Sequence, residues 1–246
     1  MKREYGIQLY SIRDLASVDL ESALSAVSEM GYSYVEFAGF FSHTADEVSA
    51  MLNKYGLKNF GAHVKFFDVT ESEMDSFIGF HQKIGTKSLI IPAFDGTELT
   101  LERMISFLNT WKTKFEDAGI TLGYHNHSFE MLPTSYGKTI FNELVERTEC
   151  ELEIDIFWAY NAGIDPVALI EKYHNRIRAI HIKDGIAAKN GEKEIGYSLG
   201  LGEVPVYECI RIADKYGILS IVESEGLDPS GKEEVERCMK YLRSID

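Results

Sequence analysis

Amphipathic stretches that end in glycine alternate with short apolar stretches along the whole chain. In the amphipathic stretches, apolar residues recur at the spacing expected for a helix with one buried face. Five of these stretches close on a glycine, and an apolar, β-branched run follows each one. The glycines are Gly31, Gly56, Gly85, Gly119 and Gly217. Because glycine readily adopts the left-handed conformation that ends helices, the pattern predicts repeated helix–glycine–strand units.

The same pattern locates eight strands and eight helices. The strands are expected at 5–10, 33–38, 58–65, 87–92, 120–127, 151–156, 177–183 and 218–224. The helices are expected near 19–30, 44–55, 70–84, 99–118, 137–148, 165–174, 205–216 and 231–243. Strands that alternate with helices at about 30 residues per unit are typical of a (β/α)8 barrel.

Several of the expected helices begin with capping residues. A threonine or serine followed three residues later by glutamate forms a capping box. This spacing occurs at Thr44 and Glu47, at Thr70 and Glu73, and at Ser230 and Glu233. Asp165 precedes Pro166, which predicts a helix N-cap followed by a proline at the first helical position.

A doubly wound open sheet is the competing architecture. It would place a glycine-rich dinucleotide fingerprint after the first strand, but residues 8–13 read Gln-Leu-Tyr-Ser-Ile-Arg. No linker or low-complexity segment divides the chain. We therefore expect one α/β domain over residues 1–246, a (β/α)8 TIM barrel.

Composition and charge narrow the class of partner. The chain has 246 residues, is 45% hydrophobic and carries a formal net charge of -14. An acidic chain disfavours a nucleic-acid partner, because such proteins usually present a basic face. No apolar run is long enough to span a membrane, and a strand is expected almost at the N-terminus, where a signal peptide would otherwise lie. The three cysteines are widely spaced, as in reduced cytoplasmic proteins, so we predict a cytoplasmic location.

Candidate metal ligands lie where the last four barrel strands end. In such barrels the active site forms at the carboxyl ends of the strands. His125 and His127 are two residues apart, so their side chains point to the same side of the fifth strand. Asp155, His181 and Glu223 end the next three strands, each within or after an apolar run. Because a buried charge is costly unless it is paired or bound to metal, we predict a divalent-metal site.

These ligand types suit Mn²⁺, Zn²⁺ or Co²⁺ better than Ca²⁺, and Mg²⁺ is also compatible with them. The structural alternative for the two histidines is a pair of hydrogen-bonded polar residues that closes a strand.

Taken together, these segments resemble the xylose isomerase-like barrel superfamily, and within it the sugar phosphate isomerase/epimerase group. The matching segments are 6–14, 124–127, 155–158, 162–166, 181–184, 200–203 and 222–223. The resemblance implies one metal ligand from each of the fifth to eighth strands, and Asp155, His181 and Glu223 match three of them. The first ligand is usually a glutamate. Here we predict His127 in that place, with His125 beside it as a base or substrate contact.

The resemblance also implies a reaction. Its members isomerise or epimerise small keto-sugars, sugar phosphates or polyols by removing the proton next to a carbonyl, through an enediolate. The related ketose 3-epimerases use two metal-bound glutamates, of which this chain retains Glu223. The second role would fall to His125 or, less directly, to Glu130. This departure admits an alternative, a keto-glycoside lyase or hydratase that works by β-elimination with a single base.

The remaining expectations concern the pocket and other classes of function. We predict substrate contacts from Gln8, His63, Glu130, Trp158 and Lys183, although each could instead serve packing or hydrogen bonding. Gly200-Leu201-Gly202 is a weak candidate for a phosphate cradle. A non-catalytic sugar-binding barrel is the alternative from another class. The endonuclease activity of the same superfamily is disfavoured by the acidic charge and by the lack of further ligands, and self-association stays open.

Overall fold

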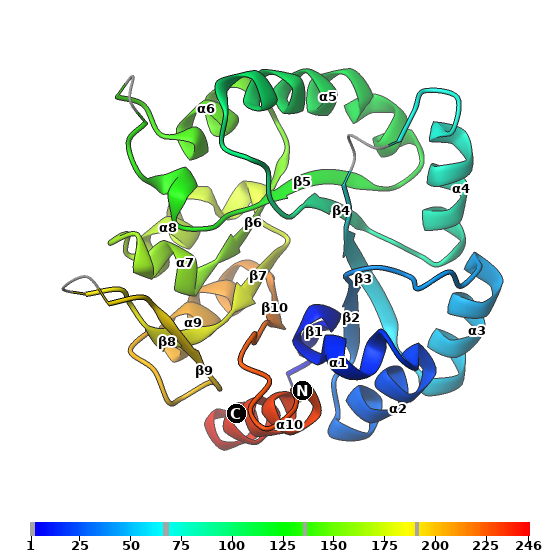
Figure 1. Ribbon diagram of the computed structural model, residues 1–246, viewed down its shortest axis with the longest axis vertical. Helices are drawn as coiled ribbons and strands as arrows, with labels where there is room; N and C mark the ends of the chain where they lie inside the picture. The colour runs from blue at the N-terminus through cyan, green and yellow to red at the C-terminus, as the bar shows by residue number, and fades with distance from the viewer. Residues whose placement is uncertain (1–2, 66–68, 135–136, 190–191) are drawn as a thin grey trace.

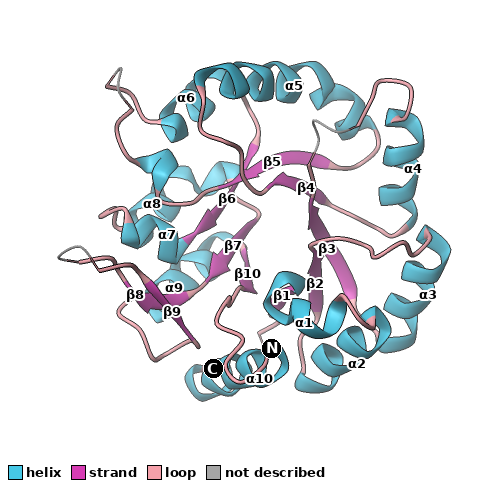
Figure 2. Ribbon diagram, viewed as in Figure 1, coloured by secondary structure: helices cyan, strands magenta, loops and turns pink. Residues whose placement is uncertain are grey.

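The structure is a computed structural model that describes residues 3–65, 69–134, 137–189 and 192–246. Eight parallel strands close into a barrel, and helices surround it on the outside (Figures 1 and 2). The barrel strands are β1 (Gly6–Gln8), β2 (Tyr34–Phe37), β3 (Lys58–His63), β4 (Ser88–Ile91), β5 (Thr121–His125), β6 (Glu151–Asp155), β7 (Ala179–Ile182) and β10 (Leu219–Val222). The predicted (β/α)8 barrel is thus confirmed, and β1 closes it by pairing with both β2 and β10.

The outer layer contains the eight predicted helices. They are α2 (Leu20–Met30), α3 (Ala45–Tyr55), α4 (Met74–Lys83), α5 (Glu98–Asp117), α6 (Ile140–Arg147), α8 (Pro166–Tyr173), α9 (Val206–Tyr216) and α10 (Gly231–Ile245). Their apolar faces pack on the outward-facing residues of the strands and form the main hydrophobic core. Within the described ranges, no helix combines the length and apolar character needed to cross a bilayer.

The capping residues act largely as expected. Thr44 and Glu47 form a complete capping box at α3, and Asp165 accepts hydrogen bonds from two backbone N–H groups at the start of α8. Ser230 caps α10 by accepting from the N–H of Glu233. Thr70 and Glu73 are hydrogen-bonded to each other, but α4 begins only at Met74. The start expected for that helix was therefore wrong by about one turn.

Several short elements were not expected. A 3₁₀ helix (Leu9–Ile12) and α1 (Arg13–Ala16) follow β1, and α7 (Ile156–Asn161) begins directly after β6. An antiparallel hairpin, β8 (Asp184–Ile186) and β9 (Ile195–Tyr197), lies in the connection from β7 to α9. These insertions follow strand ends, so they build the rim at which the site lies.

The barrel interior has an apolar floor and a polar upper part. Phe60, Ala179 and Ile221 form a small buried cluster of their own, separate from the outer core. Buried polar side chains fill the space above it, with Asp155 level with His181 in the register of β6 and β7. Gly61 leaves room for this layer, because a Cβ there would lie 3.1 Å from a carboxylate oxygen of Glu36 and 2.7 Å from the backbone oxygen of Ser88.

Candidate active site

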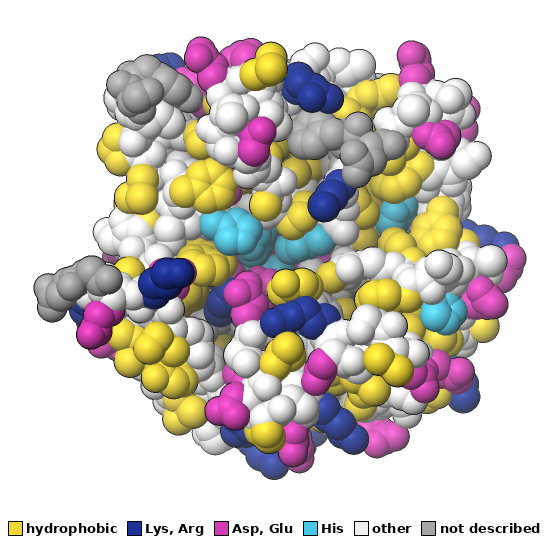
Figure 3. Space-filling model, viewed as in Figure 1, with side chains coloured by type: hydrophobic (Ala, Val, Ile, Leu, Met, Phe, Trp, Pro, Cys, Tyr) yellow, Lys and Arg dark blue, Asp and Glu magenta, His cyan; other side chains and the backbone are white. Residues whose placement is uncertain are grey.

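A pocket of about 450 Å³ opens at the carboxyl ends of the strands. Figure 3 shows histidine side chains gathered in a hollow near the centre of this face. Its lining comes from the ends of several strands and the loops after them: Tyr10, Ala38, Gly39, His63, Val64, Lys65, Pro92, Ala93, His125, His127, Glu223 and Glu225. The size suits a small molecule, and the three histidines and two glutamates in the lining offer partners for its polar groups.

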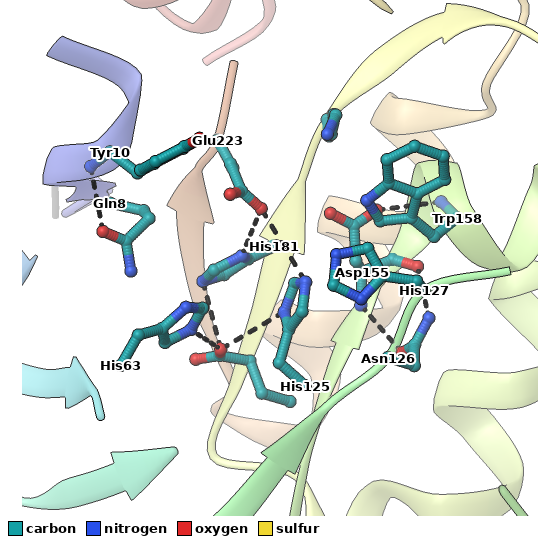
Figure 4. A network of polar contacts seen from close by, with 12 residues as sticks. Gln8, Tyr10, His63, His125, Asn126, His127, Asp155, Trp158, His181 and Glu223 are labelled. Carbon is teal, nitrogen blue, oxygen red and sulfur yellow. Dashed lines mark hydrogen bonds and ion pairs between the residues drawn. The ribbon is translucent and has the colours of Figure 1, made fainter. Parts of the chain in front are cut away.

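Two of the lining residues, His125 and Glu223, form a buried group with Asp155 and His181, which we call the upper cluster. Each offers one ligand atom, and all four atoms lie within 4.8 Å of one another. Oε2 of Glu223 is 2.8 Å from Nδ1 of His181 and 4.0 Å from Nε2 of His125 (Figure 4). The three strand-end residues predicted to meet at one rim, Asp155, His181 and Glu223, therefore do so.

Asp155 is held by its local structure. Its Oδ1 accepts a hydrogen bond of 2.9 Å from the N–H of Trp158, which caps α7. The side chain of Asn126 pairs with the backbone N–H and C=O of Asp155 at 3.1 and 3.4 Å and so ties β5 to β6. The other carboxylate oxygen, Oδ2, is buried and has no hydrogen-bond partner among the described residues. An orphaned carboxylate oxygen beside two imidazoles and a second carboxylate fits a divalent cation.

A second group lies directly beneath and shares one histidine. We call Glu36, His63, Glu153 and His181 the lower cluster. Nε2 of His181 is 2.7 Å from Oε2 of Glu36 and 3.2 Å from Oε2 of Glu153. Nε2 of His63 is 2.7 Å from the same oxygen of Glu153 and 3.3 Å from that of Glu36. His181 therefore contacts the upper cluster through one ring nitrogen and the lower cluster through the other.

Burial and neighbouring charges shift the pKa values of the buried acids, upward for Glu153 and Asp155 and downward for Glu223. Burial, reinforced by the charge of Glu36, raises the pKa of Glu153 to about 8. Burial likewise raises the pKa of Asp155 to about 7, although the charge of Lys183 opposes it. For Glu223 the burial effect is outweighed by His181 and Lys183, which hold its pKa well below the usual value. Glu223 is thus the most readily ionised acid of the upper cluster.

Burial, together with the charge of His181, holds the pKa of His125 well below its usual value. His125 is therefore a neutral imidazole, the form that binds metals. Burial alone would lower the pKa of Lys183 as well, but Glu223 and Asp155 outweigh it and raise the pKa. Its Nζ lies 2.7 Å from Oε1 of Glu225 and 4.4 Å from the ring centre of Trp158. The predicted contacts His63, Trp158 and Lys183 thus all lie at or beside the pocket.

His127 does not take the place predicted for it. Strand β5 ends at His125, and the imidazole of His127 lies beside Trp158, with ring centres 5.4 Å apart. Two sets of residues in the described part of the chain have the spacing of metal ligands: the upper cluster, and His63, His125, Glu153 and His181. Both sets include His125, and neither includes His127. The strand was expected to continue to residue 127, and its earlier end is why the two histidines have different surroundings.

Two predicted substrate contacts are instead internal. Gln8 is fully buried, and its Nε2 donates a hydrogen bond of 2.8 Å to Glu36. Glu130 is also fully buried, and it accepts hydrogen bonds from the Tyr124 hydroxyl at 2.6 Å and the His127 N–H at 2.8 Å. In this structure each of the two side chains is bound to a neighbouring protein group, and neither is among the residues that line the pocket.

The glycine loop was also wrong as a phosphate cradle. The backbone N–H groups of Gly200 and Gly202 donate to the carboxylate of Asp184 at 2.9 and 3.0 Å. The same carboxylate accepts from Gly185 and Val204. The chain therefore supplies its own anion where the sequence suggested an external one.

Glu36 and Glu153 were not predicted as site residues. Glu153 stands in the run Glu151-Leu152-Glu153-Ile154-Asp155, in which every second residue is acidic. Because alternate residues of a strand share a face, this spacing sends all three carboxylates into the barrel. That alternation was the available signal, whereas the meeting of Glu36 with Glu153 depends on barrel closure.

Comparisons with known proteins agree with this fold. The family model of the xylose isomerase-like TIM barrel matches residues 24–245. An inosose dehydratase of Geobacillus kaustophilus is 25% identical over 191 residues, which cover 67% of this chain and 61% of that relative's own length. An inosose dehydratase of Clostridium beijerinckii is 22% identical, over 92% of this chain and 88% of the relative.

Solved structures share the fold. A sugar phosphate isomerase/epimerase of Parabacteroides distasonis superposes with a TM-score of 0.80 at 23% identity, over 98% of both chains. The probable 3-DHS dehydratase of Bacillus anthracis superposes with a TM-score of 0.73 at 14% identity, also over 98% of both chains. On the match to the family model, which spans most of its length, this chain belongs to the xylose isomerase-like TIM barrel family.

Proposed function

We propose that the chain is a divalent-metal-dependent lyase that dehydrates a small polyhydroxylated ketone, either a keto-sugar or a keto-cyclitol. The reaction removes the proton next to the carbonyl and expels the hydroxyl group of the following carbon as water. The upper cluster at the bottom of a pocket of this size is the observation that carries the proposal. The sequence relatives named inosose dehydratase support the same class of reaction.

The upper cluster would hold the metal through its two imidazoles and two carboxylates. Zn²⁺, Mn²⁺ and Co²⁺ all suit this donor set. When bound, the metal would polarise the substrate carbonyl and stabilise the negative charge that develops on its oxygen.

Glu223 is the proposed base. Its Oε2 faces His181, and a carboxylate has a second oxygen that stays free to accept a proton. His125 was predicted as a base, but an imidazole that binds metal has committed its only lone pair. The chain therefore offers one base where a two-carboxylate epimerase has two, and β-elimination needs only one.

His127 is the proposed acid that protonates the departing hydroxyl group. Burial opposes its protonation, but the carboxylate of Glu130 outweighs burial and raises its pKa. The side chain is 29% exposed and lines the pocket, so its proton can reach a bound substrate. Trp158, which lies beside it, offers an apolar face for the C–H side of a ring.

Isomerisation or epimerisation is the second candidate, and one observation favours it. His63 and His127 flank His125, each with its ring centre 5.1 Å away (Figure 4). His63 and His127 both line the pocket, one on each side of His125, and could return the proton to different positions of the same intermediate. Both reactions begin with removal of the same proton, so only their products distinguish them.

Incubation of the metal-loaded enzyme with inososes and ketohexoses in D₂O tests both candidates. Dehydration gives a product lighter by one water, with an unsaturated carbonyl chromophore. Isomerisation or epimerisation gives a product of the parent formula that carries solvent deuterium. Absence of dehydration, isomerisation and exchange across both substrate classes, with wild-type enzyme of verified metal content, would contradict the proposal.

A further inference from the structure

We propose that the lower cluster is a second metal site inside the barrel, with His63 Nε2, His181 Nε2, Glu153 Oε2 and Glu36 Oε2 as ligands. Its ligands come from β2, β3, β6 and β7, so only the closed barrel assembles it. Two imidazoles and two carboxylates favour Zn²⁺. The site shares His181 with the upper cluster, but no step of the reaction proposed above uses it.

The spacing of the donor atoms supports this assignment. Bonds of roughly 2.0–2.2 Å place the ligands of tetrahedral zinc roughly 3.4 Å apart. The four nitrogen–oxygen separations in the lower cluster are 2.7, 2.7, 3.2 and 3.3 Å. A fifth atom, Nδ1 of His125, lies 3.5 Å from Oε2 of Glu153. The donors already converge, and small outward shifts would complete a coordination sphere.

Unsatisfied donors and acceptors surround the same point. Oε1 of Glu36, Oε1 of Glu153 and Nδ1 of His125 are buried and lack hydrogen-bond partners in the described part of the chain. All three side chains are at most 2% exposed, so water cannot easily reach them. Buried polar atoms without partners are costly, and a cation held by these two carboxylates would also lie close to their second oxygens.

The charges in the interior point the same way. Glu36 and Glu153 are fully buried acids, with the imidazoles of His63 and His181 at contact distance. A divalent cation between two buried acids lowers the cost of holding both in their ionised form. His181 would bridge the two ions as an imidazolate, its last ring proton released to solvent when the second ion binds.

Metal analysis of the full-length chain tests the inference. After loading with Zn²⁺ and removal of free metal, we expect two zinc ions per wild-type chain by elemental analysis. Glu153→Gln should retain only the upper ion, and Asp155→Asn only the lower one. Glu151→Gln is the matched control, because that buried acid lies two residues earlier on β6 and contacts hydroxyls of Ser88 and Thr121 instead. It should keep both ions.

Co²⁺ substitution gives a second readout that does not depend on activity. The absorption of tetrahedral Co²⁺ in the visible range should fall in Glu153→Gln and persist in Glu151→Gln. His63→Gln, at a pocket-lining position, should lose the same ion if Glu153→Gln does not fold. One zinc ion per wild-type chain, lost in Asp155→Asn and kept in Glu153→Gln, would overturn the second site and leave the proposed function standing. A single ion with the opposite pattern would support the lower site and overturn the upper one.

Discussion

The two carboxylate oxygens of Asp155 have different roles. Oδ1 caps α7, and Oδ2 points into the upper cluster without a partner. Asp155→Asn can keep the cap through its amide oxygen but replaces a metal-binding oxygen with NH₂. We expect it to fold normally and to weaken metal binding at the upper cluster by at least about tenfold in calorimetric titration.

Asp155→Ala is the companion variant. It should lose the metal and also about 1 kcal/mol of stability from the missing N-cap, measured by urea unfolding of the metal-free proteins. Equal metal affinity in wild type and Asp155→Asn would show that this oxygen is not a ligand.

A single residue, Asp184, holds the loop after β7 in place. Its carboxylate accepts hydrogen bonds from four backbone N–H groups, of Gly185, Gly200, Gly202 and Val204. Asp184→Asn would turn one acceptor into a donor that faces these donors. We expect a loss of about 1–3 kcal/mol of unfolding free energy, read from urea denaturation. Asp165→Asn, which preserves an exposed N-cap, is the control and should change stability little. A stability of Asp184→Asn equal to that of wild type would show that this network contributes nothing.

At the scale of elements, α4 contains an acid-sensitive contact. His81 is buried among Phe40, Phe77 and Phe80, and burial lowers its pKa to about 4. The Thr86 hydroxyl accepts from Asn59 and lies 3.1 Å from Nδ1 of His81, to which it can donate only while that nitrogen is unprotonated. In the unfolded chain the imidazole has its ordinary, higher pKa of about 6.5. The stability that it contributes is therefore complete above about pH 6.5 and is lost as pH falls toward 4, by about 3 kcal/mol.

His81→Phe should remove this part of the acid sensitivity. Urea unfolding at pH 7 and at pH 4.5 should show a smaller difference for the variant than for wild type. Equal differences in the two proteins would mean that other groups cause the acid response.

Helices and strands could be predicted where the residues that determine them lie within the element itself. The strand interiors and most helices follow from periodicity, glycine and capping residues, all of which act within one element. The hairpin of β8 and β9 was missed because its strands are three residues each, with few apolar positions. The early end of β5, which separates His125 from His127, depends on α7 and on the Asn126 pairing with β6 rather than on β5 itself.

The site was predictable only in part for the same reason. Asp155, His181 and Glu223 stand out as charged residues in apolar runs, so the sequence reveals them one at a time. Glu36 and Glu153 gain their importance from each other and from His63, which lies 90 residues before Glu153. Such a contact exists only once the barrel has closed.

For the whole molecule, metal binding should stabilise the fold. A ligand at about 100 times its dissociation constant adds about 2.7 kcal/mol of stability, if it binds only the folded chain. At about 2–4 °C per kcal/mol for a domain of this size, added Zn²⁺ or Mn²⁺ should raise the melting temperature by roughly 5–10 °C. EDTA should reverse the shift in scanning calorimetry, and Asp155→Asn should show a smaller one. Wild-type protein with the same melting temperature in EDTA and in excess metal would argue against both metal sites.

One side chain, His181, belongs to both of the buried clusters beneath the pocket. Its two ring nitrogens face Glu223 on one side and Glu36 on the other. No other natural residue offers two such atoms at opposite edges of a rigid ring. In a saturation library sorted by metal content, we therefore expect every replacement of His181 to lose both ions at once, whereas a replacement of Glu153 or Asp155 loses only one.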